Sequence, residues 1–330
     1  MVSATMTGGR RQVLRAAATM LTAIALPARA AGAYPDRPVT IVVPFAAGGS
    51  GDVYARLLAP HLQQEFAQSF IVENHPGAGS LIGTQFAKAA AADGYTLMII
   101  SNTHTVNDTL FPKSSARLMR DFVAVAPINS ADLVLVTRPT LGARTVSELI
   151  AMAKAKPGAL TFASSGPGTP YHMAGELFKQ MAGVDMLHVP YKLSSAARID
   201  VIAGQVDMMF DAPTTMDGFI KSDKVIGLAT TGLKKSDVLP DLPTVAESVP
   251  GYEAVIWLGV MAPKGVPDAV IDTLNTTIAR IVQQPDVAAA WRLQGADPLV
   301  MSPAKFKEFL EADIAKWARV VKLAGVRPGQ

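Results

Sequence analysis

Apolar runs of strand length alternate with segments of helical period along most of this 330-residue chain. Val39–Phe45 and Leu160–Ala163 are short apolar runs, and the first is rich in β-branched residues. Within 52–66, by contrast, Val and Leu residues recur at the spacing of one helical face. Such alternation is typical of an α/β fold with parallel sheets.

The same patterns place the individual elements. Strands are predicted at 39–45, 70–73, 95–100, 122–128, 133–136, 160–163, 186–190, 205–210, 225–230 and 254–261. Helices are predicted at 52–66, 80–92, 170–181, 194–203, 267–282, 285–293 and 303–324. Thr145 begins a capping box for a further helix that 156–158 ends, and Ser80 and Thr169 are expected to cap the helices that follow them. We expect four aromatic residues of the C-terminal helices to be core: Trp291, Phe306, Phe309 and Trp317.

Two of the strands run directly into a loop of small residues and then into a helix start. These loops are Ala46–Asp52 and Ser164–Pro170. Each leaves the first backbone N–H groups of a helix unpaired at the positive end of the helix dipole, with no bulky side chain to keep an anion away. Either loop by itself is typical of an ordinary helix cap, but the pair indicates a clamp for an acidic small molecule. We expect Gly49 and Gly168 to provide access for the ligand more than packing.

Polar residues follow the carboxyl ends of two other predicted strands. Ser101–Thr105 and Asp211–Thr215 occupy these positions as loops. Ligands of open α/β sheets bind outside the carboxyl ends of strands, so both segments are candidates for ligand contact. The sequence leaves three roles open for Asp52, which can cap a helix, orient a water, or pair with an amino or ammonium group on the ligand. If Asp211 faces the ligand, it would favour an amino-dicarboxylate.

The first thirty-three residues have the pattern of a signal peptide. They contain four arginines and no acidic residue, an apolar run at 16–26, and small-x-small sites that predict cleavage after Ala30 or Ala33. The apolar run is too short to span a bilayer. Both general secretion and twin-arginine export fit the leader. The whole chain carries a net charge of +3 and the leader contributes +4, so the mature part is close to neutral at −1.

Composition excludes several classes of function. The chain has no cysteine, which rules out disulfides, thiolate metal sites and cysteine nucleophiles. Its mature part has no basic patch suited to nucleic acid. Its five histidines lack the spacing of a metal motif, and no cofactor is expected. An exported hydrolase is a competing hypothesis, with a serine of 164–165 as nucleophile and His172 or His188 as base, but no G-x-S-x-G elbow is present.

Several motifs occur in order along the mature chain. They are Tyr34–Val39, Val43–Gly49, Val72–Gly79, Ala92–Leu97, Phe162–Gly166, Ala174–Phe178, His188–Lys192, Gly204–Asp211 and Leu242–Glu247. On these motifs the chain resembles the Bug family, the periplasmic solute receptors of tripartite tricarboxylate transporters. The resemblance implies a type II periplasmic binding fold, in which two α/β lobes are joined by two crossing strands around a ligand cleft. The first lobe is expected to comprise 34–128 plus 255–330, and the second 129–254.

The resemblance also implies a function without catalysis. A receptor of this kind binds a small carboxylate (a di- or tricarboxylate, an aromatic or an amino acid) and delivers it to the permease subunits in the membrane. We expect a periplasmic monomer, and a sensor that presents the bound acid to a signalling partner is the alternative. The matching positions in the first lobe are Phe45, Ala46, Gly48, Gly49, Ser50, Asp52, Ser101, Asn102 and Thr103. Those in the second lobe are Ser164, Ser165, Gly168, Thr169, His172, Tyr191 and Asp211.

The chain departs from the family pattern in the second lobe. Leu193 replaces a usual glycine, Pro170 and Tyr171 replace small polar residues, and Ala212 stands where asparagine is common. These changes predict a larger and less polar wall, and therefore a bulkier or partly apolar acid.

Overall fold

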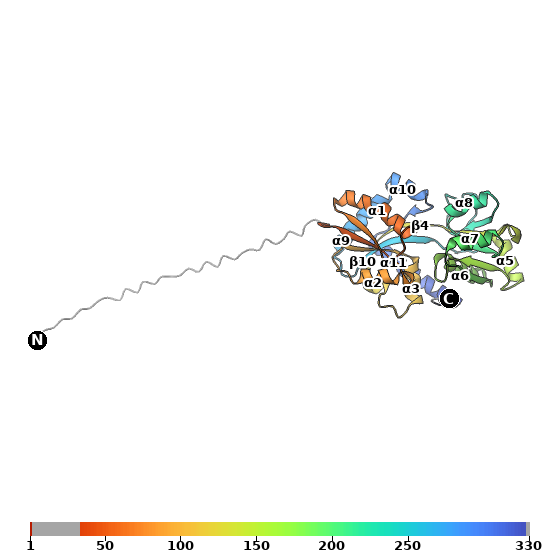
Figure 1. Ribbon diagram of the computed structural model, residues 1–330, viewed down its shortest axis with the longest axis horizontal. Coiled ribbons are helices and arrows are strands. Elements are labelled where there is room, and N and C mark those ends of the chain that lie inside the picture. Colours follow the sequence, from red (N-terminus) through yellow and green to blue (C-terminus); the bar gives the residue numbers. More distant parts are fainter. Residues whose placement is uncertain (2–33, 328–330) are drawn as a thin grey trace. The chain divides into compact units, whose positions relative to one another are not determined.

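Two β-sheets, each covered by helices, organise the chain from Pro35 onward (Figure 1). The computed structural model describes Met1 and residues 34–327, so the predicted leader and its cleavage sites lie outside the described residues. The chain leaves the first sheet after β4, Phe122–Ala131, and returns to it with β10, Ile256–Pro263. The predicted α/β fold with two lobes is confirmed.

The first sheet has the strand order β11-β4-β10-β3-β1-β2. Its other strands are β1 (Val39–Val43), β2 (Phe70–Asn74), β3 (Thr96–Ser101) and β11 (Asp297–Pro298). β1 is parallel to both β2 and β3, whereas β10 is antiparallel to β3 and β4. The carboxyl ends of β1 and β3 therefore lie at the same edge of this sheet.

The second sheet has the order β7-β6-β8-β5-β9. Its strands are β5 (Val134–Thr137), β6 (Thr161–Ser164), β7 (Leu187–Pro190), β8 (Met208–Asp211) and β9 (Ile226–Thr230). β6 is parallel to β7 and to β8, and β5 runs antiparallel to β8 and β9. The loops after β6, β7 and β8 consequently share one edge.

Helices cover both sheets. The first lobe carries α1 (Ser50–Phe66), α2 (Leu81–Lys88), α3 (Asn102–Leu110), α4 (Leu118–Asp121), α9 (Asp268–Val282), α10 (Pro285–Arg292) and α11 (Pro303–Ala324). The second carries α5 (Val146–Ala155), α6 (Pro170–Ala182), α7 (Ser194–Ile202) and α8 (Pro213–Lys221). Short 3₁₀ turns are η1 (Ala78–Ser80), η2 (Pro139–Leu141) and η3 (Val245–Glu247). Within the described residues, no helix is both long and apolar enough to cross a membrane.

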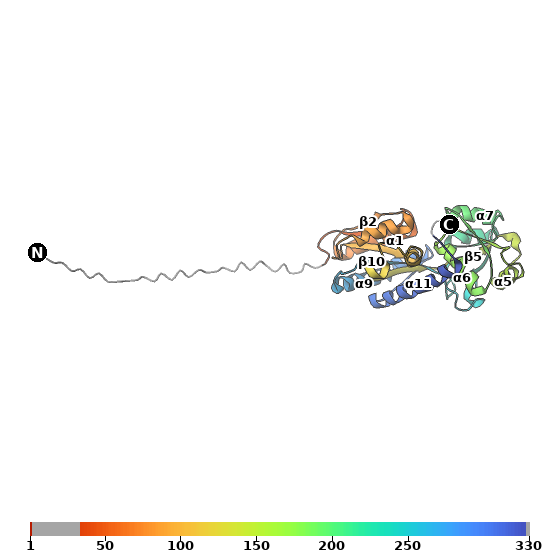
Figure 2. The ribbon, with the colours of Figure 1, turned by 90° about the horizontal axis from the view of Figure 1, so that it is seen from below.

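In the second lobe, α6 and α7 pack on opposite faces of the sheet (Figure 2). Phe162 of β6 and Phe210 of β8 pack with α6. Their neighbours in the sequence, Ala163 and Met209, pack with Ala197 of α7. This division follows from the alternation of side chains along each strand. The helices can therefore meet only around the edge of the sheet.

Several predicted elements need correction. The segments expected as loops, Ser101–Thr105 and Asp211–Thr215, run into the helices α3 and α8 instead. The helix that follows Ser80 ends at Lys88. The Ser80 side chain does not cap it, because Ser80 is the last residue of the 3₁₀ turn η1 and has a left-handed φ of 78°. The capping box at Thr145 and the cap of α6 by Thr169 are confirmed. Trp291, Phe306 and Trp317 are buried as predicted, and Phe309 is partly buried.

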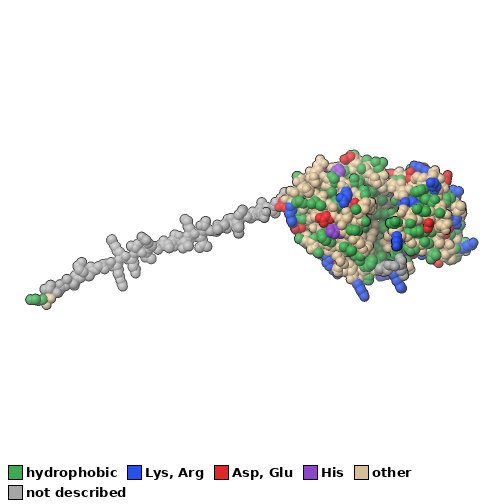
Figure 3. Space-filling model, viewed as in Figure 1, with side chains coloured by type: hydrophobic (Ala, Val, Ile, Leu, Met, Phe, Trp, Pro, Cys, Tyr) green, Lys and Arg blue, Asp and Glu red, His purple; other side chains and the backbone are tan. Residues whose placement is uncertain are grey.

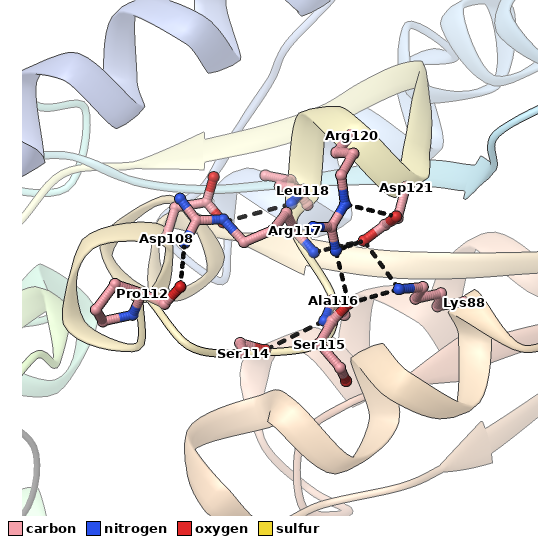
Figure 4. A network of polar contacts seen from close by, with 10 residues as sticks. All are labelled: Lys88, Asp108, Pro112, Ser114, Ser115, Ala116, Arg117, Leu118, Arg120 and Asp121. Carbon is pink, nitrogen blue, oxygen red and sulfur yellow. Dashed lines mark hydrogen bonds and ion pairs between the residues drawn. The ribbon is translucent and has the colours of Figure 1, made fainter.

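A polar network around Asp121 fixes the connection between α3 and β4 (Figure 4). The Asp121 carboxylate accepts the Arg117 N–H at 2.7 Å and the Arg120 guanidinium at 2.7 Å, with the Lys88 ammonium at 3.3 Å. Arg120 lowers the pKa of Asp121 well below its usual range; burial opposes this, and the other two donors add to the lowering. The ionised carboxylate is thus part of the folded state.

Replacing this carboxylate tests how much the network stabilises the first lobe. We expect Asp121→Asn to lower the free energy of unfolding by about 1–3 kcal/mol at neutral pH, because donors aimed at a charge lose their partner. A depressed pKa gives stability that is present above the unfolded value of about 3.9 and is lost as the pH falls towards the folded value. Denaturant titrations at pH 7 and pH 3 measure both effects: the difference in stability between the variant and the wild type should be smaller at pH 3 than at pH 7.

The exposed pair of Glu65 and Arg280 supplies the control, since Glu65→Gln should change stability much less. Equal losses for the two variants would contradict a special role for Asp121.

Candidate functional site

The first glycine loop is held in shape by Asp52. Its carboxylate, 4% exposed, accepts the Gly48 N–H at 2.8 Å, the Arg56 Nε at 2.9 Å and the Asn74 Nδ2 at 2.9 Å. Burial alone would raise the pKa of Asp52, but these hydrogen bonds lower it below its usual value. Asp52 therefore braces the loop from within its own lobe and keeps its negative charge.

The N-terminus of α1 stays free of side-chain caps. Gly49 is the N-cap residue, with φ −75° and ψ 166°, and no side chain bonds to the first N–H groups. Gly48 has a φ of +79°, a conformation that glycine adopts without strain. Ala46 accepts the Gly49 N–H through its carbonyl oxygen at 3.2 Å, which closes the turn. The N–H groups of Ser50 and its neighbours can thus serve an anion.

Phe45 joins the first loop to the beginning of α3. Its ring meets the His104 ring edge-on with centroids 5.6 Å apart. A Cβ atom on Gly51 would lie 2.6 Å from the same ring, so only glycine fits there. Ser101 caps α3 by accepting the Thr103 N–H at 3.2 Å. Phe45, Ser101 and Thr103, three of the predicted site residues, are thus brought together.

Two buried polar groups at the start of α3 complete this corner. The Asn102 amide donates to the carbonyl oxygen of Val255 at 3.2 Å, which ties α3 to the residue that precedes β10. The His104 Nδ1 accepts the Ser101 N–H at 3.1 Å, and burial lowers the pKa of His104 to about 4. His104 is therefore neutral and acts as part of the cap.

The second glycine loop is braced in a similar way by histidine. The Gly168 N–H donates to Nδ1 of His172 at 3.1 Å, and Thr169 caps α6. The Thr169 hydroxyl in turn donates to the carbonyl oxygen of Gly166 at 2.7 Å. His172 is 4% exposed, and its Nε2 lies 3.7 Å from Glu176. The structure thus places His172 behind the loop as a support, while Ser165 and Thr169 lie on the loop itself.

Ser164 and His188 form a close pair that resembles part of a hydrolase site. Ser164 Oγ lies 2.6 Å from His188 Nε2 and accepts the Gly166 N–H at 3.1 Å. Burial, together with the neighbouring His172, lowers the pKa of His188 to about 3. Ser164 has no exposed surface, so its hydroxyl supports the loop and cannot reach a substrate.

Both glycine loops contact the same helix of the first lobe. His104, near the first turn of α3, meets the first loop through Phe45. At the end of α3, a Cβ atom on Gly168 would lie only 2.7 Å from Leu110 Cδ1. These two points are six residues apart, about 9 Å along the helix. The loops therefore flank one helix, and Figure 3 shows a groove between the lobes.

Tyr191 and Asp211 lie at the same edge of the second sheet but are engaged with protein groups. The Tyr191 N–H donates to the Ser164 carbonyl at 3.0 Å, and the Tyr191 hydroxyl donates to Asp200 at 2.5 Å. Asp211, 1% exposed, accepts the Arg198 Nε and the Ala212 N–H at 2.9 and 2.8 Å. Arg198 and the Ala212 N–H thus already bond to the Asp211 carboxylate, which was expected to favour an amino-dicarboxylate only if it faced the ligand.

Arg198 is the residue that the sequence reasoning missed. Burial and the charge of Asp211 raise the pKa of Tyr171 to about 12, and the charge of Arg198 opposes this rise. Burial raises the pKa of Asp211, and Arg198 counters it. The wall predicted to be apolar thus contains an ion pair. Within residues 34–327, no group of three His, Asp or Glu side chains could hold a metal ion.

Comparisons with known proteins agree with this geometry. Residues 54–326 match the family model described as the tripartite tricarboxylate transporter family receptor. The chain is 37% identical over 300 residues to the protein BugT of Bordetella pertussis, covering 90% of this chain and 92% of that protein.

Two solved structures of Rhodopseudomonas palustris proteins share the fold. Rpa4515 with adipate is 34% identical, with a TM-score of 0.76, covering 89% of this chain and 99% of that one. MatC with bound malate is 30% identical, with a TM-score of 0.72, covering 87% of this chain and 100% of that one.

The contact between Gly168 and Leu110 counts against the expectation that this glycine provides access more than packing. Gly168 has a φ of +75° and no room for a Cβ atom. We therefore expect Gly168→Ala to lower the melting temperature of the unliganded protein. Gly183→Ala, with a φ of +63° and open space at its Cβ, isolates the backbone strain, which costs about 1 kcal/mol. Calorimetry measures the melting temperatures of both variants. A decrease for Gly168→Ala no larger than that for Gly183→Ala would refute the packing role of Gly168.

Proposed function

Because the chain belongs to the family of tripartite tricarboxylate transporter receptors, we propose that it captures a small organic acid between its lobes and delivers it to the membrane subunits of such a transporter. Members of this family are periplasmic binding receptors and not enzymes. The proposal includes export of this chain to the periplasm, with removal of the leader after Ala30 or Ala33.

One observation supports the proposal most directly: two glycine loops, one from each lobe, flank α3, and the first of them leaves the N-terminus of α1 without a side-chain cap. The loop after β1 precedes the uncapped α1, and the loop after β6 precedes α6. Each hydrogen bond to a charged group contributes about 1.5–3 kcal/mol. Four or five such donors are enough for the roughly −8 kcal/mol of a micromolar complex after ordering costs.

The ligands named for two similar structures support an acid. Adipate and malate, the compounds in Rpa4515 and MatC, both carry carboxylate groups. A ligand that touches both lobes stabilises the closed arrangement by its differential affinity for it. The closed form is then the one that we expect the membrane subunits to recognise.

A thermal-shift panel tests the ligand class. We expect the mature protein to be stabilised by organic acids and not by neutral sugars, with about 2.7 kcal/mol gained at a hundredfold excess over Kd. Gly49→Val should remove this gain, because a side chain beside the α1 N–H groups keeps an anion away. Gly218→Val, at an open position inside α8, is the control and should retain the gain. A response to neutral compounds alone would exclude an acid receptor.

A further inference from the structure

The Asp211–Arg198 pair places a cation at the edge of the second sheet where the loops lie. Asp211 is the last residue of β8, and β8 is parallel to β6, which leads into the second glycine loop. Arg198 belongs to α7 on one face of this sheet, and Tyr171 belongs to the first turn of α6 on the other. Arg198 Nε bonds to the Asp211 carboxylate at 2.9 Å. The Arg198 side chain therefore lies at the carboxyl edge of the strands.

The direction of the Arg198 side chain agrees with this position. Ala197 and Val201 bury the inner face of α7 against the sheet. Helical side chains point back towards the N-terminus of their helix, and the N-terminus of α7 follows the carboxyl end of β7. Arg198 is therefore directed towards the edge that carries the second glycine loop, which itself contacts α3 of the first lobe.

The pairing with Asp211 leaves half of the guanidinium available. Only Nε of Arg198 is bonded to Asp211, at 2.9 Å. Neither Nη nitrogen of Arg198 bonds to another residue in the part of the chain that the structure describes, and both keep some surface accessible to solvent. The side chain is 18% exposed and Asp211 1%, so the carboxylate is a buried support and the guanidinium reaches solvent. Two parallel N–H groups at the end of a fixed guanidinium match the two oxygens of a carboxylate.

We propose that Arg198 binds a second acidic group of the ligand, so that this protein prefers dicarboxylates to monocarboxylates of the same chain length. The inference rests on the proposed function, in which the glycine loops hold the first carboxylate. Asp211 is a positioning residue that fixes Arg198, while Arg198 sets specificity. The pair is neutral as a whole, so the end of the guanidinium acts through directed hydrogen bonds more than through net charge.

Isothermal titration with matched acids tests the proposal. The probes are succinate, glutarate and adipate, set against butyrate, pentanoate and hexanoate. The wild-type protein should bind at least one diacid more tightly than its monoacid partner. Arg198→Gln should weaken the binding of that diacid about 10- to 100-fold and leave the affinity for the monoacid unchanged. Arg198→Lys keeps the charge but not the planar guanidinium. Its affinity for the diacid should lie between those of the wild type and Arg198→Gln.

Arg138→Gln is the matched control. Arg138 Nε bonds to Asp207 at 2.9 Å with a similar side-chain exposure of 24%, but Asp207 precedes β8 and lies at the opposite edge of the sheet. This variant should keep the diacid preference, and melting temperatures of the unliganded variants confirm folding. Two results would overturn the role of Arg198 but not the proposed function. One is equal affinity of the wild type for diacids and monoacids, and the other is an unchanged preference in Arg198→Gln. Failure of every acid to bind overturns the proposed function as well.

Discussion

The proposed site depends on hydrogen bonds that hold each glycine loop from behind. Asp52 accepts the Gly48 N–H in one lobe, and His172 accepts the Gly168 N–H in the other. Both acceptors are more than nine-tenths buried, so neither competes with a ligand for space. Loops fixed in this way need little reordering when an anion binds, which preserves binding free energy that flexible loops would lose. Uncharged amides can then hold a charged ligand.

The two lobes pair their buried acidic side chains differently. In the first lobe the acidic side chain of Asp52 is matched by Arg56 and Asn74, all within that lobe. In the second lobe the buried Asp211 carboxylate bonds to Nε of one arginine, Arg198, whose side chain is partly exposed to solvent. In the proposed binding mode, backbone N–H groups hold the first acidic group of the ligand and a side chain holds the second. A change of that side chain is a simple way for one fold to select among acids of different length.

The sequence predicts the strands and the two glycine loops well, because buried strands are runs of β-branched residues and glycine marks tight turns. It misses α3 and α8, whose residues have low helix propensity. Val106 and Leu110 make α3 a helix by packing against the second lobe, a contact that local patterns do not contain. Arg198 was missed for a related reason. Its role depends on a partner thirteen residues away, reached only after α7 has packed on the sheet.

The C-terminal helix α11 belongs to both hydrophobic cores. Phe306 and Leu310, in its first half, pack with the first lobe, whereas Trp317, Val320 and Val321 pack with Met173 and Phe178 of the second. Because α11 packs into both cores, separation of the lobes would expose apolar side chains of this helix to water. A chain shortened before Trp317 would lose the part of α11 that packs with Met173 and Phe178.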